Sequence, residues 1–281
     1  MTFSLKEVFH DIPVVRVVDV GASPIDGKPV YEPLREHGGA EVVGFEPSSD
    51  QYRRLLELEI PHATFLPDAI GDGTPGELKI CRGPGMTSML EPDARVLSHF
   101  HWFDTYAEVV SREPMETRRL DDVPETEGMD FLKVDVQGGE MGVFEGARDR
   151  LASAVMIHTE VQFVPFYENQ PLFADLDRTL RDAGFWFHKF APIHSRVFKP
   201  LVVNNDLYAG MSQQLWSDAV YVRPFVDFGE LEAARLLKIA VLAHDLYQSY
   251  DLALLALQHL AAREGSERHI RYLERLSSVL T

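Results

Sequence analysis

Cysteine and basic residues are both scarce in this chain. Its 281 residues include a single cysteine, Cys81. One cysteine excludes an intramolecular disulfide and a cysteine-based zinc cluster, so we interpret Cys81 as a buried, inert thiol. The 27 lysines and arginines are outnumbered by 44 acids, which gives a formal net charge of −17. Nucleic acids and anionic membranes require a basic footprint, so neither is an expected partner.

Long apolar runs are also absent. None approaches the roughly 18 residues that a membrane-spanning helix requires. Residues 1–15 carry scattered charges and lack the apolar core of a signal peptide. These two absences predict a cytoplasmic protein without a membrane partner.

What the chain does contain is an alternation of apolar, β-branched runs and amphipathic segments. We predict strands at residues 14–20, 41–47, 63–67, 77–81, 129–136, 153–161, 185–190 and 218–223. Predicted helices between them span residues 31–38, 48–58, 140–147 and 171–183, while residues 94–105 fit either a helix or an irregular cover. Strands that alternate with helices at this spacing indicate βαβ units. The expected fold class is therefore α/β, with a doubly wound, mostly parallel sheet and an antiparallel pair at its edge.

After Pro224 the pattern changes, because residues 229–281 contain no strand-like run. Their apolar spacing predicts helices at about 230–247, 251–263 and 267–279. We therefore divide the chain into a domain of residues 1–225 and a helical appendage of residues 226–281. The appendage is interpreted as a packing cover or as a surface for homo-oligomer formation.

Acidic residues stand at the carboxyl ends of the predicted strands, where open parallel sheets bind their ligands. They are Asp19, Glu46, Asp68, Asp135 and Glu160. Glu46 can accept hydrogen bonds from both ribose hydroxyls of a nucleoside, and Asp68 can accept one from an exocyclic amine such as adenine N6. Gly21 allows the backbone to approach the ligand closely. These positions predict a nucleoside-type cofactor at this edge of the sheet.

The dinucleotide fingerprint G-x-G-x-x-G is missing, because the turn after the first strand reads Gly-Ala-Ser-Pro-Ile-Asp-Gly over residues 21–27. A pyrophosphate needs that glycine turn at a helix N-terminus, whereas a cofactor without phosphates does not. The pattern therefore favours S-adenosylmethionine over a nicotinamide dinucleotide, and an acid-lined pocket suits its positive charge. A nucleotide-cofactor oxidoreductase and a non-catalytic cofactor-binding scaffold remain alternatives.

Across residues 14–225 the chain resembles the FkbM family of S-adenosylmethionine-dependent methyltransferases. The segments that carry the resemblance are VVDVGASPIDG (17–27), VVGFEPS (42–48), DAIGDG (68–73), PGMTSML (84–90), RRLDD (118–122), FLKVDVQGGE (131–140) and HTEVQFVPFY (158–167). The resemblance implies a seven-stranded class I (Rossmann-like) methyltransferase fold and methyl transfer to an oxygen of a sugar, polyketide or similar small molecule. It also implies cofactor contacts, at the methionine end from Asp19, Gly21 and Ala22, at the ribose from Glu46, and at the adenine from Asp68 and Ala69. Pro47, next to Glu46, is a further expected cofactor contact.

Two positions depart from the family pattern. Ile25 stands where the family commonly has a further glycine. Gln137 stands in a motif that more often reads Asp-x-Glu-Gly. If that acid assists catalysis in relatives, residue 137 does not supply it here.

A methyltransferase that acts on a hydroxyl must hold the acceptor near the methyl carbon and remove the acceptor's proton. Asp135 and Glu160 end neighbouring strands, and can act as base and orienter or share a divalent metal ion. Lys133 and His158 lie two residues earlier, on the same strand faces. We interpret Lys133 as catalytic or as an ion-pair partner of Asp135. His158 is interpreted as a base or as a hydrogen-bonded core residue.

Polar residues near these strand ends are candidate contacts to the acceptor. They are Ser88, Gln137, Gln162 and, in the insertion at residues 191–217, Asn205. The expected acceptor is a small molecule or a carbohydrate that carries a hydroxyl group.

Overall fold

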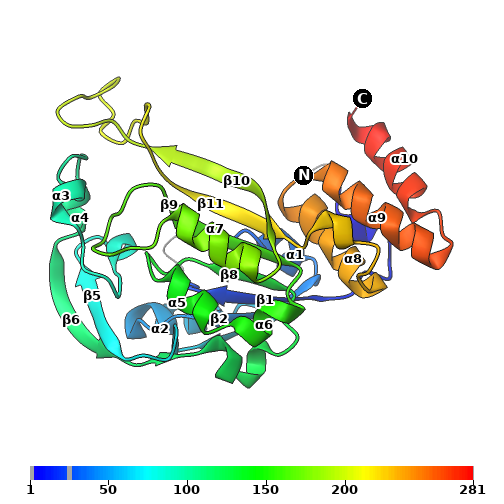
Figure 1. Cartoon of the computed structure of the whole chain (residues 1–281), viewed down its shortest axis with the longest axis horizontal. Coiled ribbons are helices and arrows are strands. Elements are labelled where there is room, and N and C mark those ends of the chain that lie inside the picture. The colour runs from blue at the N-terminus through cyan, green and yellow to red at the C-terminus, as the bar shows by residue number, and fades with distance from the viewer. Residues whose placement is uncertain (1–2, 24–26, 281) are drawn as a thin grey trace.

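The computed structural model describes residues 3–23 and 27–280, so Ile25 lies outside the described residues. A seven-stranded sheet forms its centre (Figure 1). From one edge to the other, its strands are β10 (Trp186–Ser195), β11 (Gln214–Val222), β9 (Met156–Gln162), β8 (Phe131–Val134), β1 (Val15–Val20), β2 (Ala40–Phe45) and β3 (Ala63–Leu66). The pairs from β9 to β3 are parallel, and β11 runs antiparallel to both of its neighbours. The predicted α/β fold with an antiparallel pair at its edge is confirmed.

One face of the sheet packs against α5 (Glu140–Glu145), α6 (Arg148–Ser153) and α7 (Phe173–Asp182). Val18 and Val20 of β1 and Leu132 of β8 point to this side, where they meet Phe144 and Leu176 of the helices. Alternate residues of the same strands point to the opposite face, since successive side chains of a strand alternate. Each central strand is therefore buried on both faces, as its continuous apolar sequence predicts.

The opposite face is covered mainly by the C-terminal helices α8 (Ala233–Val241) and α9 (Tyr250–Glu264), with α1 (Glu32–Glu36) and α10 (Arg268–Leu280). Val17, Phe131 and Met156 of the sheet belong to the same buried cluster as Leu236 and Leu257 of these helices. A π-helical turn, Leu242–Leu246, connects α8 to α9. Residues 226–281 thus form a layer of the fold, because they bury a sheet face that would otherwise be exposed.

The N-terminal segment is joined to this helical layer. The buried carboxylate of Asp245 accepts hydrogen bonds from the Ser4 hydroxyl and the Leu5 amide, both at 2.9 Å. Buried His244 contacts the carbonyl oxygen of Phe3 through Nε2 and the Tyr272 hydroxyl through Nδ1, also at 2.9 Å each. Both ends of the chain therefore meet on the same side of the molecule (Figure 1).

Further elements lie outside the central sheet. They are α2 (Ser49–Glu57), the paired strands β4 (Ala69–Ile70) and β7 (Thr117–Arg118), the helices α3 (Ala94–Leu97) and α4 (Phe103–Tyr106), and a hairpin of β5 (Gly76–Cys81) and β6 (Val109–Met115). The hairpin stands apart from the central sheet (Figure 1). None of the helices in the described part of the chain has the length and apolar character needed to cross a membrane.

Candidate active site

A cavity of about 440 Å³ opens at the carboxyl ends of β1, β2 and β8, with the β5–β6 hairpin and the loop of residues 84–89 on its far side. Eight predicted site residues line it: Gly21, Glu46, Pro47, Asp68, Ala69, Ser88, Asp135 and Gln137. Open parallel sheets bind ligands at this edge, where the loops after neighbouring strands diverge. The cavity therefore brings most of the predicted cofactor contacts together with part of the predicted reaction site, while Asp19 and Ala22 are not among its described lining residues.

Gly21 allows two strand ends to approach each other. Its φ is +86°, and a Cβ atom built on it would lie 1.9 Å from the carbonyl oxygen of Asp135. Both the left-handed conformation and the close approach require glycine. The amides of Gly21 and Ala22 donate to the Phe45 carbonyl at 3.1 and 2.9 Å, which ties the turn to β2.

Glu46 and Pro47 lie at the end of β2, on the wall of the cavity. Glu46 is only 6% exposed, and its Oε1 accepts the Ser48 amide at 2.8 Å. Further along the wall, Asp68 follows β3, and its carboxylate lies 3.8 Å from the Arg118 guanidinium. β5 and β6 supply the opposite wall, which the sequence motifs did not predict, through Leu78, Ile80, Glu113 and Met115.

Asp19 and Lys133 form a buried ion pair beside the cavity, and neither is among its described lining residues. The Lys133 ammonium lies 3.1 Å from Asp19 Oδ1 and donates to the Gly21 carbonyl at 2.8 Å. The Tyr31 hydroxyl donates to Asp19 Oδ2 at 2.6 Å. Burial raises the pKa of Asp19, while the charge of Lys133 and the Tyr31 hydrogen bond oppose the rise. The Asp19–Lys133 pair thus holds the Gly21 carbonyl in place from the side away from the cavity.

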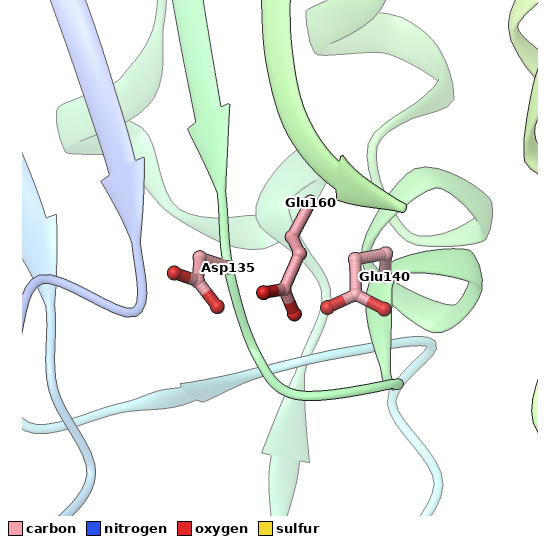
Figure 2. A group of neighbouring side chains, drawn as sticks. All are labelled: Asp135, Glu140 and Glu160. Carbon is pink, nitrogen blue, oxygen red and sulfur yellow. The ribbon is translucent and has the colours of Figure 1, made fainter. Parts of the chain in front are cut away.

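Three carboxyl groups gather where β8 and β9 end, those of Asp135, Glu140 and Glu160. One oxygen of each lies within 4.8 Å of the others, and Figure 2 shows the Glu160 carboxyl group between those of Asp135 and Glu140. Glu140, the first residue of α5, is 1% exposed and was not predicted as a site residue. Burial and, less strongly, the charge of Asp135 raise the pKa of Glu140 to about 7.

Two glutamine side chains lie against this carboxylate cluster. The Gln137 amide nitrogen donates to Asp135 Oδ1 at 2.7 Å and to Glu160 Oε2 at 3.4 Å. Gln162, which is 1% exposed, donates to the same Glu160 oxygen at 2.6 Å. The Ser88 hydroxyl donates to the main-chain carbonyl of Gln137 at 2.6 Å. Ser88, Gln137 and Gln162 thus lie close together, and each forms a hydrogen bond to a neighbouring protein group.

His158 and Asn205 lie apart from this cluster. His158 Nδ1 is 3.0 Å from the Tyr247 hydroxyl, and its Nε2 is 3.5 Å from Asp218. Both ring nitrogens therefore face protein groups on the sheet side covered by the C-terminal helices, as in a structural histidine. Asn205 sits in an exposed turn with φ +53° at Asn204 and +59° at Asn205, and is not among the described residues that line the cavity.

The sheet order, the single antiparallel strand and the cavity at the strand ends define a class I methyltransferase fold. The family model described as the methyltransferase FkbM domain matches residues 19–187. The chain belongs to this family of S-adenosylmethionine-dependent methyltransferases, as its sequence motifs predict. Membership sets aside the oxidoreductase and scaffold interpretations.

Solved methyltransferase structures resemble the chain only distantly. Magnesium protoporphyrin IX methyltransferase from Synechocystis PCC 6803, with bound S-adenosylmethionine, is 13% identical with a TM-score of 0.37, over 76% of this chain and 73% of that one. Precorrin-6y C5,15-methyltransferase from Geobacter metallireducens is 11% identical with a TM-score of 0.39, over 77% and 84%. A comparison with curated proteins found no match. The assignment therefore rests on the family match.

Proposed function

We propose that this methyltransferase transfers the methyl group of S-adenosylmethionine to a hydroxyl oxygen of a small molecule or carbohydrate. The observation that carries the proposal is the carboxylate cluster at one end of the cavity, because a hydroxyl acceptor must lose a proton as it is methylated. Asp135 lines the cavity, and Glu160 adjoins it through the Gln137 amide. Two carboxylates at this point can take up and hold that proton.

The proposed cofactor position follows the lining residues. The Gly21 turn and Asp135 border the methionine end, Glu46 accepts from the ribose hydroxyls, and Asp68 accepts from the adenine amine. When bound, the cofactor supplies a sulfonium whose methyl carbon is open to in-line attack. The chain's own part is to orient the acceptor oxygen with Asp135 and to accept its proton on Glu160.

A divalent metal ion at Asp135 and Glu160 is the second candidate for the same site. Oxygens within 4.8 Å of one another are compatible with metal–oxygen distances of about 2.0–2.6 Å, and carboxylate oxygens suit Mg²⁺ or Ca²⁺. Against a metal ion, the Gln137 amide nitrogen already donates to both carboxylates, and an N–H group cannot act as a metal ligand. Transfer that persists in EDTA and does not rise with added Mg²⁺ would exclude an essential ion.

The test of the proposal uses S-adenosylmethionine labelled in its methyl group and a panel of hydroxylated small molecules and sugars, each matched to its amino analogue. We expect labelled ether products from the hydroxyl compounds, and at least tenfold less product from Asp135→Asn and Glu160→Gln. Asp122→Asn, an exposed acid outside the site, is the control. Label transfer to the amino analogues alone would contradict oxygen as the acceptor atom.

Three further proposals come from the sequence. They are a domain boundary at residue 225, a cytoplasmic location and self-association through α8–α10. Light scattering at several protein concentrations tests the last of these, and a mass equal to that of one chain throughout would contradict it.

A further inference from the structure

The turn between β8 and α5 has an unusual backbone. Gln137 has φ +56° and Gly138 has φ +95°, so two successive residues adopt left-handed conformations. This conformation is unfavourable for a residue with a side chain, and such residues persist where the surroundings hold them. A Cβ atom at Gly138 would lie 3.0 Å from the Tyr167 ring, so the turn is also tightly packed. The contacts around Gln137 must therefore maintain its conformation.

Two buried side chains provide those contacts. Glu140 Oε1 accepts the amides of Val136 and Gly138, both at 3.1 Å, and so grips the backbone on either side of Gln137. The Ser88 hydroxyl donates to the Gln137 carbonyl at 2.6 Å. Glu140 and Ser88 are each 1% exposed, and hydrogen bonds shielded from water resist competition by solvent. The backbone of Gln137 is thus held from both sides.

The held backbone directs the Gln137 side chain to the reaction site. Its amide nitrogen contacts Asp135 Oδ1 at 2.7 Å and Glu160 Oε2 at 3.4 Å. One N–H₂ group placed between two carboxylates reduces their mutual repulsion and fixes their orientation. If Gln137 left its left-handed backbone conformation, its side-chain amide would move, and both carboxylates would lose the hydrogen-bond donor that they share.

We propose that Glu140 is a positioning residue for methyl transfer, which acts through the 136–138 turn to hold the Gln137 amide between Asp135 and Glu160. The catalytic consequence rests on the proposed function. The structural part does not, because the orientation of Gln137 can be observed without any acceptor.

Two substitutions at residue 140 separate geometry from charge. Glu140→Gln keeps an oxygen at Oε1 that can accept both backbone amides, whereas Glu140→Leu removes the acceptor at similar volume. The probe is the side-chain amide signal of Gln137 in a ¹⁵N–¹H NMR spectrum, assigned by its loss in Gln137→Leu. We expect this signal to be unchanged in Glu140→Gln and displaced in Glu140→Leu. Exposed Glu145 of the same helix, changed to Leu, is the matched control and should leave the signal in place.

The kinetic readout uses an acceptor that the wild-type protein methylates. Misplaced reacting groups lower the rate of the chemical step, so kcat should fall roughly 10- to 100-fold in Glu140→Leu while KM for S-adenosylmethionine changes little. The double variant with Gln137→Leu should have the same kcat as the slower of the two single variants. Both changes remove the same contact, that of the Gln137 amide with the two carboxylates, so their effects should not multiply. Glu140→Gln should retain most of the wild-type kcat.

Three results would overturn the proposal: an unchanged Gln137 signal in Glu140→Leu, rate losses that multiply in the double variant, or a Glu140→Gln variant as slow as Glu140→Leu. If Glu140→Leu does not fold, Ser88→Ala removes the other support of the turn and should displace the same signal. If the wild-type protein transfers no methyl group, the proposed function is refuted, but the role of Glu140 in the turn is not, because the NMR comparison tests that role without an acceptor.

Discussion

The buried carboxyl group of Glu140 predicts a specific dependence of stability on pH. Burial raises the pKa of Glu140 from its ordinary value of 4.5 to about 7 in the folded protein. Between these values the folded state holds a proton that the unfolded state releases, so the free energy of unfolding falls as pH rises. The loss begins near pH 4.5 and levels off above pH 7. At about 1.4 kcal/mol per pKa unit, the total loss in the free energy of unfolding is about 3 kcal/mol.

Glu140→Gln should remove this dependence, because glutamine does not titrate. The measurement is urea unfolding of both proteins at half-unit steps from pH 4.5 to pH 8.5, with the stability difference plotted against pH. Other titrating groups cancel in that difference. We expect the variant to gain about 3 kcal/mol relative to wild type across this range. A flat difference would refute the reasoning, and Glu145→Gln, an exposed change on the same helix, controls for the substitution itself.

Three further predictions concern the cavity and its support. Glu46→Gln should weaken S-adenosylhomocysteine binding about tenfold or more in calorimetric titration, and a change under twofold would contradict a ribose contact. Lys133→Met leaves the Asp19 carboxylate buried without this partner and should cost roughly 3–5 kcal/mol in denaturant unfolding, against about 1 kcal/mol or less for Lys199→Met, a control at a partly exposed ion pair. Gly21→Ala places a methyl group 1.9 Å from a carbonyl oxygen, so it should abolish S-adenosylhomocysteine binding or folding, and wild-type behaviour would contradict the close approach.

The central strands could be predicted because buried parallel strands have a direct sequence signature. The runs that became β1, β2, β8 and β9 are mainly apolar, so their type could be predicted, but their predicted ends differ from the observed ones by up to three residues. The strand β6 was not foreseen, because most of its residues are exposed and Pro114 interrupts it. Its partner β5 was predicted as a strand, yet its position outside the main sheet depends on that pairing.

The candidate site was predictable where a residue's function follows from its position at a strand end. Glu46 and Asp135 lie on the cavity wall for that reason. Asp19 lies one residue before the end of β1, so strand alternation points its side chain to the sheet face opposite Val20, where it meets Lys133 of β8. Glu140 begins a helix and resembles any acid near a helix N-terminus, which concealed its role. Only the three-dimensional turn brings it to Gln137.

The helical layer on the second sheet face has a consequence for how the protein is made. Val17 and Phe131 are packed against helices that follow residue 232, so during synthesis the helices that cover them leave the ribosome after the strands do. Until then, an apolar sheet surface is open to water and to other nascent chains. The methyltransferase core should therefore recruit chaperones while it is being translated, and slow translation of α8 and α9 should lengthen that exposure.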